Sequence, residues 1–141
     1  MTRVLRAELT EAPLDVEAHA ALVGDASAGA VVTFAGVVRD HDGGRPVREL
    51  EYSAHPTAAD VLAAVTGDVA IRCERVRAIA VSHRLGRLEI GDVALACAVS
   101  ADHRQRAFAV CAELVDEIKH RLPVWKRQLF ADGTTEWVNC P

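Results

Sequence analysis

The sequence predicts an α+β fold with a mainly antiparallel sheet. Short alternating or β-branched segments outnumber the helical ones, and several neighbouring segments are joined by turn residues as in hairpins. Two long segments keep the helical spacing of apolar side chains. The chain has 141 residues, half of them hydrophobic, and shows no repeat and no Pro- or Gly-rich linker. We therefore expect a single domain over residues 1–141.

The N-terminal half is expected to alternate between strands and one short helix. Alternation over residues 3–10 predicts a strand, and residues 15–23 form a short helix candidate. Residues 30–38 are a nearly continuous apolar, β-branched run, which is typical of a buried strand. A polar loop with a Gly-Gly turn, residues 39–44, leads into a returning strand over residues 47–52.

The C-terminal half is expected to hold both long helices. The first begins near Pro56 and extends to about residue 74, and the second covers about residues 102–121. Pro123 ends the second helix, because its ring clashes with the carbonyl group four residues earlier. Strands are expected over residues 76–82, 93–100, 124–130 and 135–138.

Composition excludes several classes of protein. With a net charge of -4 and a pI near 5.8, the chain lacks the broad basic surface that is typical of a nucleic-acid-binding protein. The longest apolar run, residues 29–38, is about half of a membrane span. The N-terminus has no signal-peptide layout, so we expect a cytoplasmic protein that has no membrane partner.

The four cysteines indicate neither a disulfide framework nor a metal site. They form no CxxC pair and have no histidine at zinc-ligand spacing. Cys97 and Cys111 lie in apolar stretches and are expected in the core. Cys140, next to the C-terminus, is expected to be an exposed thiol. Asp40, His41 and Asp42 resemble ligands by type, but three adjacent residues in one loop rarely converge on one ion.

The basic residues are divided very unequally, since fourteen are Arg and two are Lys. Lys119 and Lys126 lie in an acid-free stretch, residues 118–131, on either side of Pro123. One interpretation is a solvated helix end, where cations are favoured. The other is a site, because Lys119 borders the apolar stripe, with a partly buried stem, and Trp125 offers an apolar wall. A lysine in a partly dry, cationic pocket suits acid–base chemistry or attack as an amine.

A second basic constellation is expected at the other end of the same helix. His103 and Arg104 at a helix N-terminus favour an anion site, with a simple capping motif as the alternative. Sixteen residues of helix place His103 roughly 24 Å from Lys119. The two groups therefore serve different sites, or another chain of a symmetric dimer completes one site. Arg39 and His41 form a third candidate, and the remaining histidines are interpreted as structural or surface residues, namely His19, His55, His83 and His120.

Taken in order, six segments resemble the MoaE family, the large, catalytic subunit of molybdopterin synthase. The resemblance covers about residues 3–138, and its strongest part is Pro-x-Trp-Lys with an upstream lysine. The matching segments are GAVVTFAGVVRDH (29–41), LEY (50–52), HRLG (83–86), SADHR (100–104), Lys119 and LPVWKR (122–127).

The resemblance implies an α/β-hammerhead fold and a homodimer within a heterotetramer. Each large subunit would bind one small, ubiquitin-like sulfur-carrier subunit, whose C-terminal Gly-Gly tail, as a thiocarboxylate, enters a pocket. The reaction would place two sulfurs on cyclic pyranopterin monophosphate and so form the dithiolene of molybdopterin. It would need no metal or other cofactor.

The resemblance also implies roles for individual residues. Lys119 and Lys126 would be catalytic, with Lys119 nearer the carrier terminus and Lys126 on the pterin side. The substrate-binding residues would be Val37, Val38, Arg39, His103, Arg104, Lys119, Lys126, Arg127 and Gln128. Since positions 37 and 38 are both valine, contacts there would use the backbone. Two alternatives stay open: a non-catalytic domain that docks a Gly-Gly tail or small anion, and another anion-handling transferase on the same fold.

Overall fold

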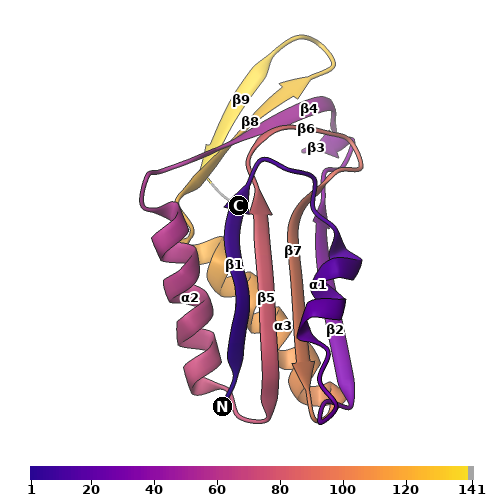
Figure 1. The fold of residues 1–141 in the computed structure, drawn as a ribbon. Helices are drawn as coiled ribbons and strands as arrows, with labels where there is room; N and C mark the ends of the chain where they lie inside the picture. The colour runs from indigo at the N-terminus through magenta and orange to yellow at the C-terminus, as the bar shows by residue number, and fades with distance from the viewer. Residues whose placement is uncertain (140–141) are drawn as a thin grey trace.

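A computed structural model describes residues 1–139 and confirms the predicted α+β class (Figure 1). Cys140, predicted as an exposed thiol, lies outside the described residues. The elements in chain order are β1 (Arg3–Thr10), α1 (Val16–Val23), β2 (Ala30–Val37), β3 (His41–Asp42), β4 (Arg45–Ala54), α2 (Ala58–Arg72), β5 (Val76–Arg84), β6 (Gly86–Glu89), β7 (Val93–Ala101), α3 (Arg104–Arg121), β8 (Val124–Phe130) and β9 (Thr135–Asn139). Among the described residues, no helix is both long and apolar enough to cross a membrane.

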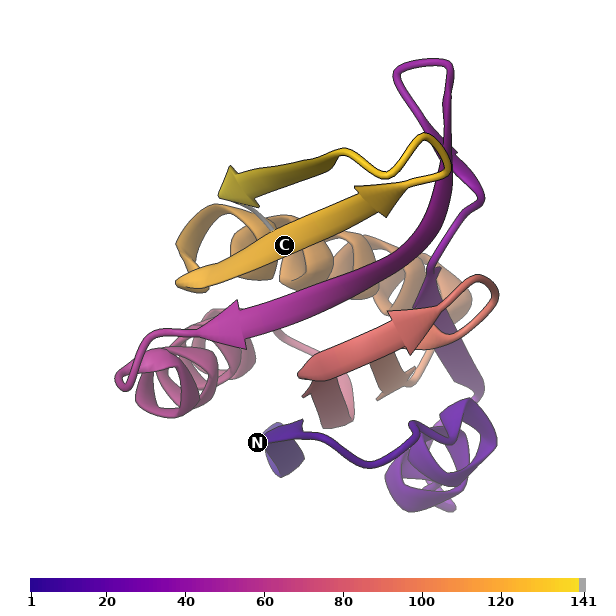
Figure 2. The ribbon, with the colours of Figure 1, turned by 90° about the horizontal axis from the view of Figure 1, so that it is seen from above.

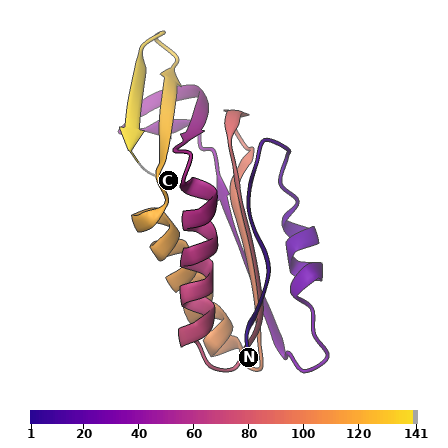
Figure 3. The ribbon, with the colours of Figure 1, turned by 60° about the vertical axis from the view of Figure 1, so that its left-hand side comes forward.

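The first sheet has the strand order β1-β5-β7-β2 and carries all three helices. Its pairs are antiparallel except for β1 with β5, which agrees with the predicted mainly antiparallel sheet. Figure 3 shows α2 and α3 on one face of this sheet and α1 on the other. The sheet therefore buries apolar side chains on both of its faces, and each helix buries one face against it.

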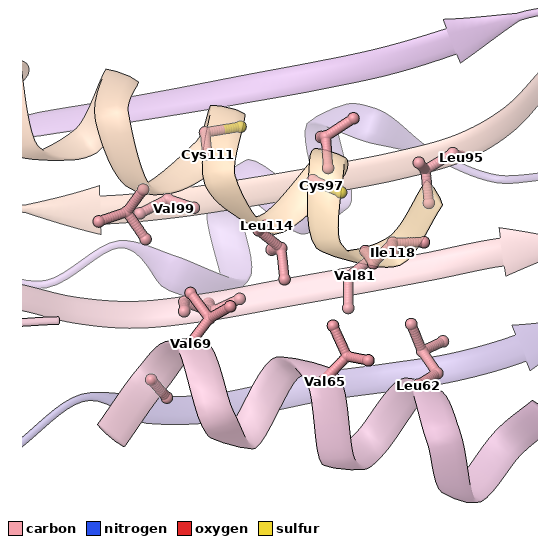
Figure 4. Packing of buried hydrophobic residues seen from close by; sticks show 14 of the residues in the cluster. Leu62, Val65, Val69, Val81, Leu95, Cys97, Val99, Cys111, Leu114 and Ile118 are labelled. Atoms are coloured by element: carbon pink, nitrogen blue, oxygen red, sulfur yellow. The ribbon is translucent and has the colours of Figure 1, made fainter. Parts of the chain in front are cut away.

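The main core lies between this sheet and the two long helices (Figure 4). Apolar side chains three or four residues apart bring one face of each helix onto the sheet, and Leu62 on α2 and Leu114 on α3 are fully buried. Cys97 and Cys111 are buried here as predicted, and burial raises the pKa of the Cys111 thiol to about 11. Burial also raises the pKa of the Cys97 thiol, so both cysteines act as small apolar residues.

The strand at β2 is confirmed, but its predicted burial is wrong. β2 is the edge of the first sheet, and its residues alternate between half-buried and exposed. Val32 and Phe34 pack against the main core, whereas Val31 and Val37 are 46% and 53% exposed. A continuous apolar run suggests two covered faces, yet this strand has only one.

The second sheet has the order β3-β4-β8-β9, with β6 also paired to β4. Figure 2 shows β6, β4, β8 and β9 side by side across one end of the first sheet. The interpretation of residues 39–44 as a loop is wrong at its centre. His41–Asp42 forms β3 and returns through Gly43 and Gly44, whose φ angles of 57° and 79° suit a tight hairpin turn.

β6 has no counterpart among the predicted strands. It is four residues long, and Leu88 is its one buried side chain, so it shows no alternation to recognise. Gly86, at φ 88°, lies at its start, and Gly91, at φ 90°, follows its end. Pairing with β4 is what makes this segment a strand.

Candidate active site

A pocket of about 310 Å³ lies where the first sheet meets the second. The end of β2, the end of β5 and the start of β7 line it from the first sheet, and β4 and β8 line it from the second. The last turn of α3 completes the wall. Its polar lining side chains are Arg39, Tyr52, His83, Lys119, Lys126 and Gln128.

Both predicted catalytic lysines line this pocket. α3 ends at Arg121, as predicted from Pro123, and β8 begins at Val124. The chain thus turns sharply between Lys119, in the last helical turn, and Lys126, the third residue of the strand. Lys126 is half-buried, whereas Lys119 as a whole residue is exposed, and the partial burial of the Lys119 stem stays a prediction.

Strand alternation along β8 separates neighbours that are adjacent in sequence. Lys126 and Gln128 face the pocket, while Trp125 and Arg127 lie on the other face of the strand. The Trp125 ring lies 6.4 Å from the ring of His55, and Arg127 Nε lies 3.4 Å from an oxygen of Glu51. The predicted Trp125 wall beside Lys126 is therefore wrong, and Arg127 does not line the pocket of its own chain.

At the rim, a carboxylate connects two lining side chains. Arg39 Nη2 donates to Asp42 Oδ1 at 3.2 Å, and Gln128 Nε2 donates to Asp42 Oδ2 at 2.7 Å. The Gln128 hydrogen bond, with the nearby charges of Lys126 and Arg39, holds the pKa of Asp42 below its usual value. Asp42 is therefore ionised at neutral pH.

Val37 and Val38 both line the pocket, but their backbones are engaged within the chain. The Val38 N–H donates to the Asp92 carbonyl at 2.9 Å, and the Val38 carbonyl accepts from the Gly91 N–H at 2.8 Å. Val37 pairs with Val93 in the ladder to β7. These bonds fix the turn that brings Arg39 to the rim.

His83 belongs to the pocket, although no spacing in the sequence indicates this place. The ring is 1% exposed, meets the Tyr52 ring edge-on at 4.8 Å, and its Nδ1–H donates to the Arg84 carbonyl at 2.8 Å. Burial and the charge of nearby Lys119 lower the pKa of His83 to about 4. The pocket therefore holds a neutral imidazole beside its cations. His19, by contrast, is a structural residue as predicted, bonded to the Asp15 carbonyl and the Ser82 hydroxyl.

His103 and Arg104 lie at the opposite end of α3 and do not contribute to this pocket. Both are exposed, and His103 lines a separate hollow of about 490 Å³ with Arg72, Arg75 and Arg106. His103 is the N-cap residue of α3, yet its side chain makes no capping hydrogen bond. The predicted separation of the two basic constellations is thus confirmed for the single chain.

Within residues 1–139, no three His, Cys, Asp or Glu side chains gather as a metal site. His41 Nδ1 lies 2.8 Å from Asp40 Oδ1, while Asp42 turns towards Arg39 and Gln128. The three adjacent loop residues therefore diverge rather than surround one point.

Comparison with known proteins adds the following matches. The model of the family described as MoaE protein matches residues 9–121. A curated protein of Nostoc sp. named molybdopterin synthase catalytic subunit is 38% identical over 132 residues, 93% of this chain and 80% of that protein. The crystal structure of molybdopterin synthase from Staphylococcus aureus superposes with a TM-score of 0.85 at 30% identity, over 93% of this chain and 95% of that one. A chain from the complex of subunits 1 and 2 of molybdopterin-converting factor from Helicobacter pylori shares the fold, with a TM-score of 0.69 at 18% identity over 98% and 88% of the two chains.

Proposed function

The chain belongs to the MoaE family, and we propose that it acts as the sulfur-transferring catalytic subunit of a molybdopterin synthase in molybdenum cofactor biosynthesis. The observation that carries this proposal is the pocket that Lys119, Lys126 and Arg39 share. We also propose that residues 1–141 form one functional domain. Its compartment is the cytoplasm, in keeping with unpaired thiols at the described cysteines Cys73, Cys97 and Cys111.

The proposed substrates are a thiocarboxylated, ubiquitin-like carrier subunit and cyclic pyranopterin monophosphate. The pocket favours this pair because it is open at the surface, which admits an extended Gly-Gly tail, and cationic, which suits a phosphate. The H. pylori chain with the same fold belongs to a two-subunit complex, which supports a small-subunit partner. The reaction as proposed uses no metal or other cofactor.

The positions of the lining residues in the pocket suggest a separate role for each. Arg39, at the rim, is proposed to bind the phosphate, and the buried Gln128 offers its amide to the pterin. Lys119 and Lys126 lie on different walls, helix and strand, so one can reach the carrier's carbonyl carbon while the other reaches the substrate oxygen that sulfur replaces. A lysine there can polarise that oxygen or transfer protons. We assign Lys119 to the carrier side and Lys126 to the pterin side.

His103 and Arg104 can join this reaction only from a second subunit. They lie at the far end of α3 from the two lysines of their own chain. In a symmetric homodimer, the N-terminal end of α3 from one copy could approach the pocket of the other. We propose this arrangement, within a heterotetramer, for His103 and Arg104. Arg127, on the outer face of β8, is assigned to contacts outside the pocket floor.

Mixed dimers test the shared site. One subunit carries Lys119→Ala and the other carries His103→Ala with Arg104→Ala, so each dimer keeps one intact composite pocket. Recovered turnover, relative to dimers with all three changes in each subunit, supports the shared site. Absence of recovery contradicts it.

The function itself is tested by reconstitution. The purified chain is mixed with thiocarboxylated carrier and cyclic pyranopterin monophosphate, and the dithiolene product is measured. Product formation supports the synthase. Carrier binding without product would favour the alternative of a non-catalytic docking domain.

A further inference from the structure

Asp42 links two parts of the pocket without lining the pocket itself. Its Oδ1 accepts from Arg39 Nη2 at 3.2 Å, and its Oδ2 accepts from Gln128 Nε2 at 2.7 Å. Arg39 follows the end of β2, in the first sheet, while Gln128 belongs to β8, in the second. One carboxylate therefore couples lining residues from the two sheets that form the pocket.

The carboxylate is held more firmly than the arginine that it binds. Asp42 pairs with Arg45 across the turn at Gly43 and Gly44, whose positive φ angles favour glycine. Its second partner, Gln128, is 3% exposed within the β4–β8 pairing. The Arg39 side chain, by contrast, is 67% exposed, and within residues 1–139 it forms one ion pair, with Asp42. The position of the guanidinium thus depends on Asp42.

We propose that Asp42 is a positioning residue that presets Arg39 and Gln128 for the anionic substrate. This inference rests on the proposed function, since it takes the phosphate of the pterin precursor as the ligand of Arg39. A side chain already held in its binding position loses less conformational freedom when the ligand arrives. A carboxylate only accepts hydrogen bonds, so it also fixes the Gln128 amide with its N–H₂ group towards Asp42 and its oxygen on the opposite side.

Two effects of the carboxylate oppose each other, and they predict opposite results. If positioning dominates, removal of Asp42 weakens binding of the precursor. If the negative charge merely repels the phosphate, removal strengthens binding. Asp42→Asn removes the charge and keeps one acceptor oxygen, whereas Asp42→Ala removes both. Comparing the two variants therefore separates positioning from simple charge.

The experiment measures kcat and KM for the pterin precursor with saturating thiocarboxylated carrier. We expect Asp42→Ala to raise KM about tenfold and Asp42→Asn to raise it less. The value of kcat should stay within about twofold of wild type in both variants, because both lysine side chains are kept and Lys126 acts on Asp42 through its charge, with no hydrogen bond between them. Asp40→Asn is the matched control. That carboxylate is 78% exposed, contacts His41 rather than the pocket, and its loss should leave KM unchanged.

The possible results separate a failure of the positioning role of Asp42 from a failure of the proposed synthase function. If the wild-type complex makes no dithiolene, the proposed function fails. If the wild type turns over and Asp42→Ala leaves KM unchanged or lowers it, the positioning role is overturned, as it is if kcat alone falls. Should Asp42→Ala unfold, Asp42→Asn decides: a KM at or below that of wild type overturns the inference, and a raised KM with wild-type kcat supports it.

Discussion

Replacing His83 should remove a large part of the acid sensitivity of this protein. Burial and the nearby Lys119 lower the pKa of His83 from 6.5 to about 4. In the unfolded chain the ring binds a proton as the pH falls through 6.5, whereas in the folded chain it stays neutral until about pH 4. The unfolded state therefore binds more protons in this window, and the free energy of unfolding decreases as the pH falls from 6.5 towards 4.

The size of this effect follows from the same values. A pKa lowered from 6.5 to about 4 corresponds to about 3 kcal/mol when the linkage is complete. At about pH 4.5 most of this contribution to the free energy of unfolding, roughly 2 to 3 kcal/mol, is already lost. Solvent screens this contribution little, since the His83 side chain is only 1% exposed.

Urea unfolding of wild type and His83→Gln at about pH 7 and about pH 4.5 measures the effect. Glutamine can donate to the Arg84 carbonyl, as the His83 ring does, but does not ionise. Wild type should lose roughly 2 to 3 kcal/mol more than His83→Gln between the two pH values. His120→Gln, at an exposed position, should behave as wild type. Equal losses in wild type and His83→Gln would refute the reasoning.

Three further predictions concern two glycines and the two lysines. A Cβ at Gly29 would lie 2.5 Å from the Asp102 carbonyl oxygen, so Gly29→Ala should cost about 1 to 3 kcal/mol in thermal or urea unfolding. Gly67, inside α2, has open space around it, so Gly67→Ala should stabilise the fold by about 1 kcal/mol; destabilisation there would contradict the packing described. Lys119→Arg and Lys126→Arg should each lose most turnover in the reconstituted assay, because a guanidinium cannot release a proton near neutral pH; full activity in both would return these lysines to the role of solvated cations.

Periodicity predicted the elements whose side chains pack on one face. The apolar stripe of α3 and the helix-ending Pro123 gave its C-terminal end at Arg121. Local pattern failed where pairing alone makes the strand, as at the two residues of β3 and the four of β6. Local pattern also failed to predict the exposure of β2. An apolar edge strand has the same sequence pattern as a central strand, and only the sheet order distinguishes the two.

The candidate site could be predicted only in part, because some of its residues are marked by the sequence and others only by the fold. Lys119 and Lys126 stand out in the sequence because they are the only lysines, on either side of a helix stop. His83 and Asp42 do not stand out in the sequence. The role of His83 depends on its burial in the folded chain, and that of Asp42 depends on its hydrogen bond with Gln128, 86 residues away. The sequence also suggested that Trp125 and Lys126 share a wall, whereas strand alternation places neighbours on opposite faces.

In the proposed reaction Lys119 takes part in the sulfur transfer itself rather than in holding the carrier. The most direct measurement is dithiolene formation by Lys119→Ala, with thiocarboxylated carrier and cyclic pyranopterin monophosphate, alongside the affinity of the same variant for the carrier. Product formation should be abolished while carrier binding survives. Normal turnover by Lys119→Ala would contradict it.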